Sequence, residues 1–113
     1  MADHINIRQA PGTWVVRAAG AVLGESQNAL ELTEGSYPPV IYFPRGDIAM
    51  AFLDQTEKTS HCPHKGDASY FTIEGKSGPL TDAAWSYEDP KDAVAAIKDH
   101  LAFYTDRVTV EQL

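Results

Sequence analysis

The residues best suited to chemistry lie in one short segment, TSHCPHKG, at positions 59–66. It contains the only cysteine of the chain, Cys62, together with His61, His64 and Lys65. A thiol reacts as its thiolate, and nearby positive charge favours that form. The segment therefore has the groups for thiol-dependent chemistry, with Cys62 as nucleophile, His64 as base and Lys65 as the source of positive charge.

The same segment is also compatible with an inert cysteine. Free cysteine is among the most buried residue types, and Pro63 directly after Cys62 indicates a packed turn. On an extended strand His61 and Cys62 point to opposite faces, so His64 is the better partner for the thiol. Methionine sulfoxide reduction is disfavoured, because the sequence has no second cysteine to resolve the oxidised thiol. The sequence leaves open whether the protein is an enzyme.

A metal site is the second chemical possibility for this segment. His61-x-x-His64 with Cys62 offers nitrogen and sulfur donors of the kind that Zn²⁺ prefers. A further ligand would have to come from His4, His100 or a distant carboxylate. Because there is no second paired motif, the sequence predicts neither a metal nor a cofactor.

Aromatic and basic residues form the other candidate site. An aromatic-lined cleft with one or two cations suits a small anionic or planar molecule. Buried tyrosine hydroxyls require partners and often point into clefts. The predicted ligand-binding residues are Tyr42, Arg45, His61, Tyr70, Trp85 and Tyr87. The alternatives are that the rings fill the core of a structural or protein-interaction module, and that Arg45 braces a carboxylate such as Asp47 or Asp67.

Bulk properties exclude several classes of protein. The 113 residues carry a formal charge of -7, and the basic residues are scattered, which disfavours nucleic-acid binding. No apolar stretch approaches the roughly 18 residues of a membrane helix. One cysteine allows no internal disulfide, and the first residues lack the pattern of a signal peptide. We therefore expect a cytoplasmic location, with no membrane and no nucleic-acid partner.

The chain should form a single domain, 1–113, with a weakly patterned arm at 1–12 and a core at 13–110. Mainly β structure is predicted, with a tight turn at 45–48 and one helix over about 90–99, where Asp89 is the expected N-cap. Strands are expected at 13–18, 21–26, 30–34, 40–43, 49–53, 58–62, 68–74, 83–87 and 102–110. The hypothesis is that the 61–66 loop, the strand end at 42–45 and residues 85–87 border one cleft, since functional residues often lie at strand ends and turns.

Four motifs resemble a known bacterial family, domain of unknown function 427, which also carries a nucleotidyltransferase-like label. They are YPPVIYFPR (37–45), HCPHKGDASY (61–70), AWSYEDP (84–90) and LAFYTDRV (101–108), and the resemblance covers about residues 14–108. It implies a β-tent fold like that of the Mss-four exchange factors: two small antiparallel sheets at an angle, with a short helix beside them. Many such relatives hold zinc with paired Cys-x-x-Cys motifs, which one cysteine cannot form. The sequence also lacks the Gly-rich phosphate loop and paired carboxylates expected for nucleotidyl transfer.

Overall fold

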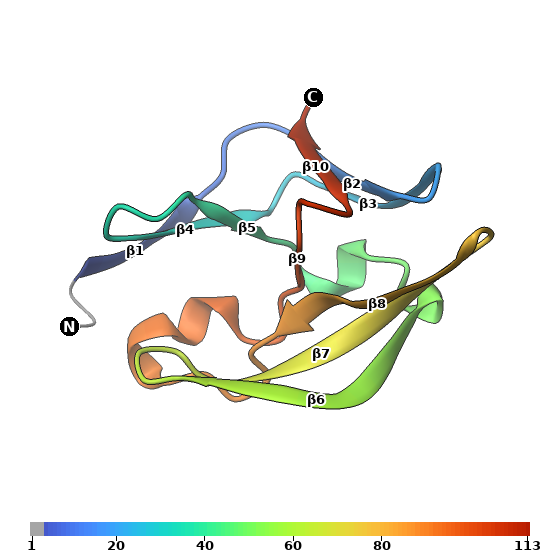
Figure 1. Cartoon of the computed structure of the whole chain (residues 1–113). Helices are drawn as coiled ribbons and strands as arrows, with labels where there is room; N and C mark the ends of the chain where they lie inside the picture. Colours follow the sequence, from blue (N-terminus) through green and yellow to red (C-terminus); the bar gives the residue numbers. More distant parts are fainter. Residues whose placement is uncertain (1–3) are drawn as a thin grey trace.

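The computed structural model describes residues 4–113, and most of them are in short antiparallel strands (Figure 1). The strands are β1 (Ile5–Gln9), β2 (Trp14–Ala18), β3 (Ala21–Ser26), β4 (Leu30–Glu34), β5 (Val40–Tyr42), β6 (Leu53–Cys62), β7 (Gly66–Gly75), β8 (Gly78–Ser86), β9 (Ala102–Phe103) and β10 (Thr109–Gln112). The 3₁₀ helices are η2 (Arg45–Asp47), η3 (Met50–Phe52) and η4 (Asp92–Ile97). The predicted mainly β class is confirmed.

Two three-stranded sheets are successive stretches of one long antiparallel pairing. One has the order β1-β4-β5 and the other β10-β2-β3. The pairing runs from Ile5 opposite Glu34 to Gln9 opposite Leu30, and continues as Trp14 opposite Ser26. In Figure 1 these strands lie above the third sheet, β6-β7-β8-β9, and form the other layer of the molecule.

The four-stranded sheet carries the segment 59–66 in its longest hairpin, β6–β7. Cys62 ends β6 opposite Gly66 at the start of β7, and the Lys65 N–H donates to the Cys62 carbonyl at 3.2 Å. Gly66 has a φ of 109°, a conformation that favours glycine. Its missing Cβ also lets the chain near Asp89 approach, since a Cβ there would lie 3.4 Å from the Asp89 carbonyl oxygen.

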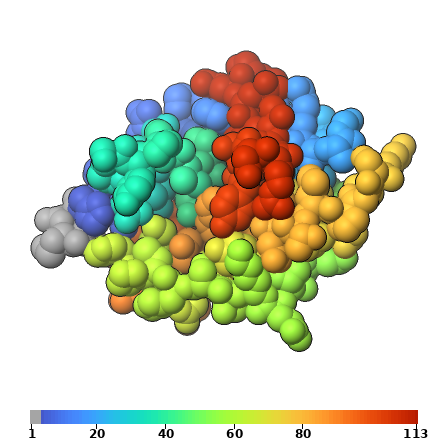
Figure 2. All heavy atoms as spheres, viewed as in Figure 1, coloured from blue at the N-terminus to red at the C-terminus, as the bar shows by residue number. Residues whose placement is uncertain are grey.

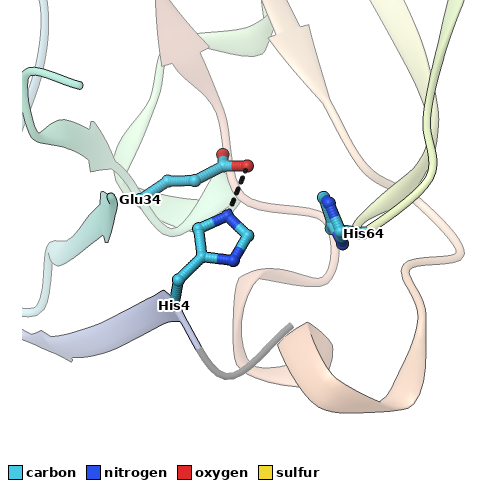
Figure 3. Close-up of side chains that lie close together, drawn as sticks. All are labelled: His4, Glu34 and His64. Atoms are coloured by element: carbon cyan, nitrogen blue, oxygen red, sulfur yellow. Dashed lines mark ion pairs between the residues drawn. The ribbon is translucent and has the colours of Figure 1, made fainter. Parts of the chain in front are cut away.

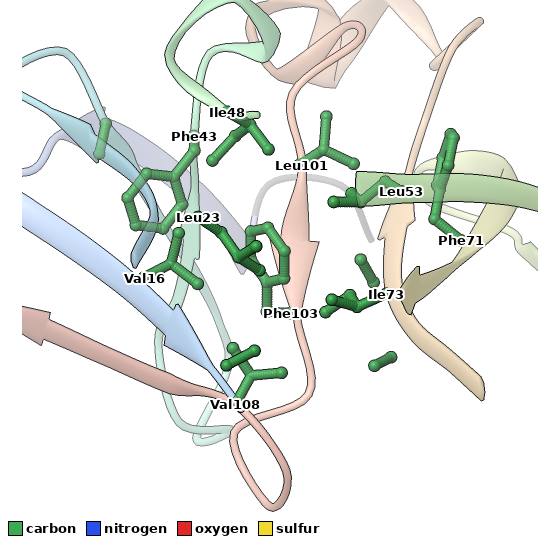
Figure 4. Packing of buried hydrophobic residues seen from close by; sticks show 14 of the residues in the cluster. Val16, Leu23, Phe43, Ile48, Leu53, Phe71, Ile73, Leu101, Phe103 and Val108 are labelled. Carbon is green, nitrogen blue, oxygen red and sulfur yellow. The ribbon is translucent and has the colours of Figure 1, made fainter. Parts of the chain in front are cut away.

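The main core fills the space between the two layers (Figure 4). Phe43 and Phe103 meet edge to face at its centre, with ring centroids 6.0 Å apart. Phe43 and Leu101 also form a backbone bridge that ties the layers together. A second cluster lies towards η4 and includes Tyr42, Tyr70 and Tyr87 together with Val94 and Ile97 of η4.

Three sheets are present where two were expected. The long pairing is interrupted near residues 10–13, where Pro11 lacks an N–H and Gly12 has a φ of 81°. The expected arm contains β1 at residues 5–9; residues 1–3 of that arm lie outside the described residues.

The predicted strand at 49–53 is wrong, whereas the predicted turn at 45–48 is confirmed by η2. Residues 50–52 form η3, and Leu53 is the first residue of β6. Phe52 is 53% exposed, so the alternation read in the sequence does not mark a buried strand face.

The predicted helix over 90–99 is shorter and irregular. It is the 3₁₀ segment η4, begun after Lys91 rather than Asp89 and broken at Val94, where φ is -124°. Tertiary hydrogen bonds hold both ends, because the Lys91 N–H donates to the Lys65 carbonyl and the Asp99 N–H to the Tyr87 carbonyl. A segment this short has little helical stability of its own, so these contacts determine its shape.

The predicted last strand, 102–110, is two strands in different sheets. β9 pairs with β8, and β10 pairs with β2. Between them the N–H groups of Arg107 and Val108 donate to the Tyr104 carbonyl in a tight turn. Within residues 4–113, no helix is long and apolar enough to cross a membrane.

Candidate functional site

A cleft of about 230 Å³ opens beside the second hydrophobic cluster. Its walls come from β4, β5, β7 and β8, the loop after β4, the β6–β7 turn, and the segment after β9. The residues that line it are Leu32, Glu34, Tyr37, Pro38, Val40, Tyr42, Lys65, Tyr70, Trp85, Tyr87 and Tyr104. All five tyrosines of the chain line this cleft.

Stacked and perpendicular rings form the walls of the cleft. Tyr70 and Tyr104 are nearly parallel, with centroids 6.5 Å apart and an interplanar angle of 10°. Trp85 lies against Tyr104 at 4.6 Å and donates its indole N–H to the Tyr42 hydroxyl at 3.4 Å. Strand pairing sets this arrangement, because Tyr70 of β7 is directly opposite Trp85 of β8.

An ion pair forms the polar end of the cleft. The Lys65 ammonium donates to Glu34 Oε1 at 2.7 Å, and only 12% of the Lys65 side chain and 19% of the Glu34 side chain are exposed. The hydrogen bond from Lys65 lowers the pKa of Glu34. Burial alone would lower the pKa of Lys65, but the hydrogen bond to Glu34 and nearby negative charge outweigh it and raise that pKa. Both groups are therefore charged near neutral pH.

Two buried phenols stand next to this ion pair. Tyr42 is 1% exposed and Tyr87 is 6% exposed, and burial raises the pKa of both. The Tyr42 hydroxyl accepts the hydrogen bond from Trp85. The Tyr87 hydroxyl has no hydrogen-bond partner within residues 4–113, although the residue lines the cleft. No described residue occupies this hydroxyl, so it can donate to or accept from a bound molecule.

The remaining tyrosines are linked by their hydroxyls. Tyr104 donates to the Tyr70 hydroxyl at 3.5 Å, and Ser60 lies 2.8 Å from that same oxygen. Burial, followed by the hydrogen bond to Tyr70, raises the pKa of Tyr104 to about 12. The Tyr104 hydroxyl therefore stays protonated at neutral pH and can act as a donor.

Cys62 is half-buried and packs against the second hydrophobic cluster. Its sulfur is close enough to the Lys65 ammonium and to the Tyr87 phenol to contribute to the raised pKa of both. The structure thus brings Cys62 and Lys65 together beside the cleft. The roles predicted for them in catalysis stay predictions.

His64 lies near this ion pair. Its ring is perpendicular to that of His4, with centroids 5.1 Å apart, and Figure 3 shows the two rings side by side below the Glu34 carboxylate. Partial burial and the positive charge of His4 lower the pKa of His64.

The structure places two predicted ligand-binding residues away from the cleft. Arg45 donates to the Asp99 carbonyl at 2.9 Å and to the Ser86 hydroxyl at 3.0 Å, and it pairs with Glu88 at 3.1 Å. It is a brace, as one of the sequence alternatives proposed, but its carboxylate partner is neither Asp47 nor Asp67. His61 is exposed and pairs with Asp67 across the hairpin at 2.7 Å.

Three residues of the site were missed from the sequence: Glu34, Tyr37 and Tyr104. Tyr37 and Tyr104 stand in two of the four motifs, and their hydroxyls were a usable signal. Glu34 had none, because its partner Lys65 is 31 residues away along the chain.

A larger groove of about 600 Å³ adjoins the cleft and shares Tyr37, Pro38, Val40, Trp85 and Tyr104 with it. Its other walls are mostly apolar and include Trp14, Ile41, Phe103 and Val110. On the face drawn in Figure 2, the teal atoms of the loop near residues 35–40 and the red atoms near 104–110 stand next to each other at this groove.

Comparison with known proteins gives the chain's family. The comparison with curated proteins gave no match. Residues 6–112, nearly the whole chain, match the family described as a domain of unknown function, DUF427. The protein belongs to the DUF427 family.

Proposed function

We propose that the protein is a small-molecule-binding domain whose cleft takes a planar molecule with a polar edge. The observation that carries the proposal is the placement of every tyrosine of the chain around one cleft. Within residues 4–113, no phenylalanine lines this cleft. The rings at the cleft are thus those with a polar group, the tyrosine hydroxyls and the Trp85 indole N–H, as expected where polar groups must meet a ligand.

The charge of the cleft favours a neutral or internally balanced ligand. Lys65 and Glu34 neutralise each other, so neither a strong cation nor a strong anion is preferred. They nevertheless offer N–H donors and carboxylate acceptors beside the Tyr87 hydroxyl. The flat faces of Trp85 and Tyr104 suit a ring. A planar heterocycle with both donors and acceptors fits these groups best.

The adjoining groove could hold an apolar extension of the same ligand. Its volume of about 600 Å³ is within the range of roughly 300–1,000 Å³ usual for small-molecule sites. The five residues that it shares with the cleft make the two spaces continuous along one face.

Thiol-dependent chemistry at Cys62 is the second candidate function. It is supported by the position of the sulfur next to the partly buried Lys65 ammonium, because a fixed positive charge stabilises a thiolate. A cytoplasmic location, where a free thiol persists, belongs to this proposal. The alternative function is a protein-interaction module in which Cys62 is inert.

Binding is tested by thermal unfolding with a panel of planar heterocycles, because a ligand at about 100 times its Kd adds about 2.7 kcal/mol of stability. Compounds that raise the melting temperature should quench Trp85 fluorescence. They should also lose affinity in Tyr87→Phe but keep it in Phe52→Leu, a change far from the cleft. A panel with no stabilising compound would favour the interaction module.

The thiol is tested by its rate of alkylation at neutral pH. The wild type should react several times faster than Lys65→Met. His61→Asn, in the strand next to Cys62, is the control. Equal rates in wild type and Lys65→Met would remove the case for an activated thiol without affecting the proposal for ligand binding.

A further inference from the structure

Three potential metal ligands converge from distant parts of the chain. His4 directly precedes β1, Glu34 ends β4, and His64 is in the turn between β6 and β7. One ligand atom from each lies within 4.8 Å of the others. Figure 3 shows the His4 imidazole directed at the Glu34 carboxylate, with the His64 ring beside the His4 ring.

We propose that His4, Glu34 and His64 bind a divalent transition-metal ion such as Zn²⁺. Two imidazole nitrogens and one carboxylate oxygen are the donor set of many catalytic zinc sites, and the same set suits several first-row metals. The motif weighed in the sequence, His61-x-x-His64 with Cys62, is not the one that the fold assembles, because His61 is paired with Asp67. Only His64 belongs to both sets.

The distances are close to those of a bound ion. His4 Nε2 lies 3.4 Å from Glu34 Oε2. Ligands about 2.0–2.1 Å from a tetrahedral zinc are about 3.3 Å apart, so this pair already has the required spacing. The ligand atoms of the three residues lie no more than 4.8 Å apart. To reach the zinc spacing of about 3.3 Å, a pair at that limit must approach by about 1.5 Å, which rotation of the His64 side chain can supply.

The second carboxylate oxygen of Glu34 is held by Lys65. The ammonium bonds Oε1 at 2.7 Å, which leaves Oε2 directed at His4. Outer partners of this kind orient a metal-binding carboxylate. The positive charge of Lys65 also opposes a cation, so we expect weaker binding than at a structural zinc site.

Three protein ligands leave a coordination position for water or another molecule. Glu34 belongs both to this cluster and to the lining of the cleft, so the ion would lie at the edge of the cleft. The metal proposal does not depend on small-molecule binding, because it stands on the three side chains alone.

The experiment is a titration of untagged, chelator-treated protein with Zn²⁺, followed by calorimetry. We expect one ion per chain. His4→Asn and His64→Asn should each weaken binding by about 10–100-fold, at least the effect of losing an outer-shell partner. His61→Asn, in the strand that leads into the same turn, is the matched control, and its affinity should equal that of the wild type.

Co²⁺ gives a second readout, since its visible spectrum reports nitrogen ligation and low coordination number. The intense bands should appear in the wild type and in His61→Asn but not in His64→Asn. Binding that is lost in His4→Asn and kept in His64→Asn would show that His4 binds the ion without His64, and it would overturn the proposal. Equal losses in all three variants would show adventitious surface binding and overturn it too. Circular dichroism confirms that each variant is folded.

Discussion

At the scale of single residues, we expect the Tyr87 hydroxyl to contribute to ligand affinity but not to the stability of the fold. It is in a residue only 6% exposed and has no partner within residues 4–113. Removing an unpartnered hydroxyl costs little, because no hydrogen bond is lost. Tyr87→Phe should therefore change the free energy of unfolding by less than about 0.5 kcal/mol, measured by urea denaturation.

The comparison for Tyr87→Phe is Tyr42→Phe, which removes the acceptor of the Trp85 N–H. That variant should be destabilised by about 1 kcal/mol, since the indole donor is left without its partner. If Tyr87→Phe lost as much stability as Tyr42→Phe, the hydroxyl would have a structural partner and would not be free for a ligand.

The Lys65–Glu34 pair predicts a pH dependence of stability. The pKa of Glu34 is held below its ordinary value of 4.5, chiefly by the hydrogen bond from Lys65. A carboxyl whose pKa is lower in the folded state adds stability above the unfolded value, and this is lost as the pH falls through the folded value. The stability difference between wild type and Glu34→Gln should therefore shrink as the pH falls below about 4.5.

This difference is measured by urea unfolding with a chelator present, from about pH 7 down to pH 3. Glu31→Gln is the control. Glu31 is on the same strand as Glu34, β4, and it pairs with the exposed Arg8 of β1. A wild-type advantage over Glu34→Gln that stayed constant across this range would mean that the carboxylate charge does not stabilise the fold.

At the scale of elements, Gly66 determines how the chain turns between β6 and β7. Its φ is 109°, and an added Cβ would meet the Asp89 carbonyl oxygen at 3.4 Å. Gly66→Ala should destabilise the protein by about 1–2 kcal/mol, because L-residues are strained at positive φ. Gly46→Ala, with open space around its Cβ position, should be nearly neutral by the same denaturant measurement. Equal effects at both glycines would contradict this account.

Arg45 joins three elements, and this role is separable from binding. Its guanidinium contacts Ser86 at the end of β8, Glu88 after it, and the Asp99 carbonyl beyond η4. Arg45→Lys should cost about 1–3 kcal/mol, since an ammonium cannot reproduce these directed bonds. Arg8→Lys, at an exposed pair, should cost less than about 1 kcal/mol. A large loss of ligand affinity in Arg45→Lys without a loss of stability would contradict the structural role.

At the scale of the whole molecule, the two layers should unfold together. Phe43 is fully buried between them and meets Phe103. Phe43→Ala should cost about 3–5 kcal/mol, whereas Phe52→Ala, at an exposed position, should stay within about 0.5 kcal/mol. Trp85 fluorescence and far-ultraviolet circular dichroism should report the same transition. Separate transitions would show that the layers are independent.

Local patterns in the sequence predicted much of the fold. The strands at 21–26 and 30–34 and the turn at 45–48 depend on alternation and on glycine or proline nearby, and the structure has them. Alternation also explains why His61 is exposed while Cys62 is half-buried. The irregular η4 and the division of 102–110 between two sheets were not predictable, because tertiary hydrogen bonds and strand partners determine them.

By itself, the sequence determined the mainly β class, the family and the loop at 61–66, since these depend on motifs of residues near one another in the chain. The tertiary structure alone decided which residues meet at the site. Packing of the β1-β4-β5 sheet against the β6–β7 hairpin brings Glu34 to Lys65, His4 to His64, and five tyrosines around one cleft. Contacts between two sheets depend on the whole fold, so no local pattern could show that Glu34, from a strand with no chemical signal, lies at the polar end of the cleft.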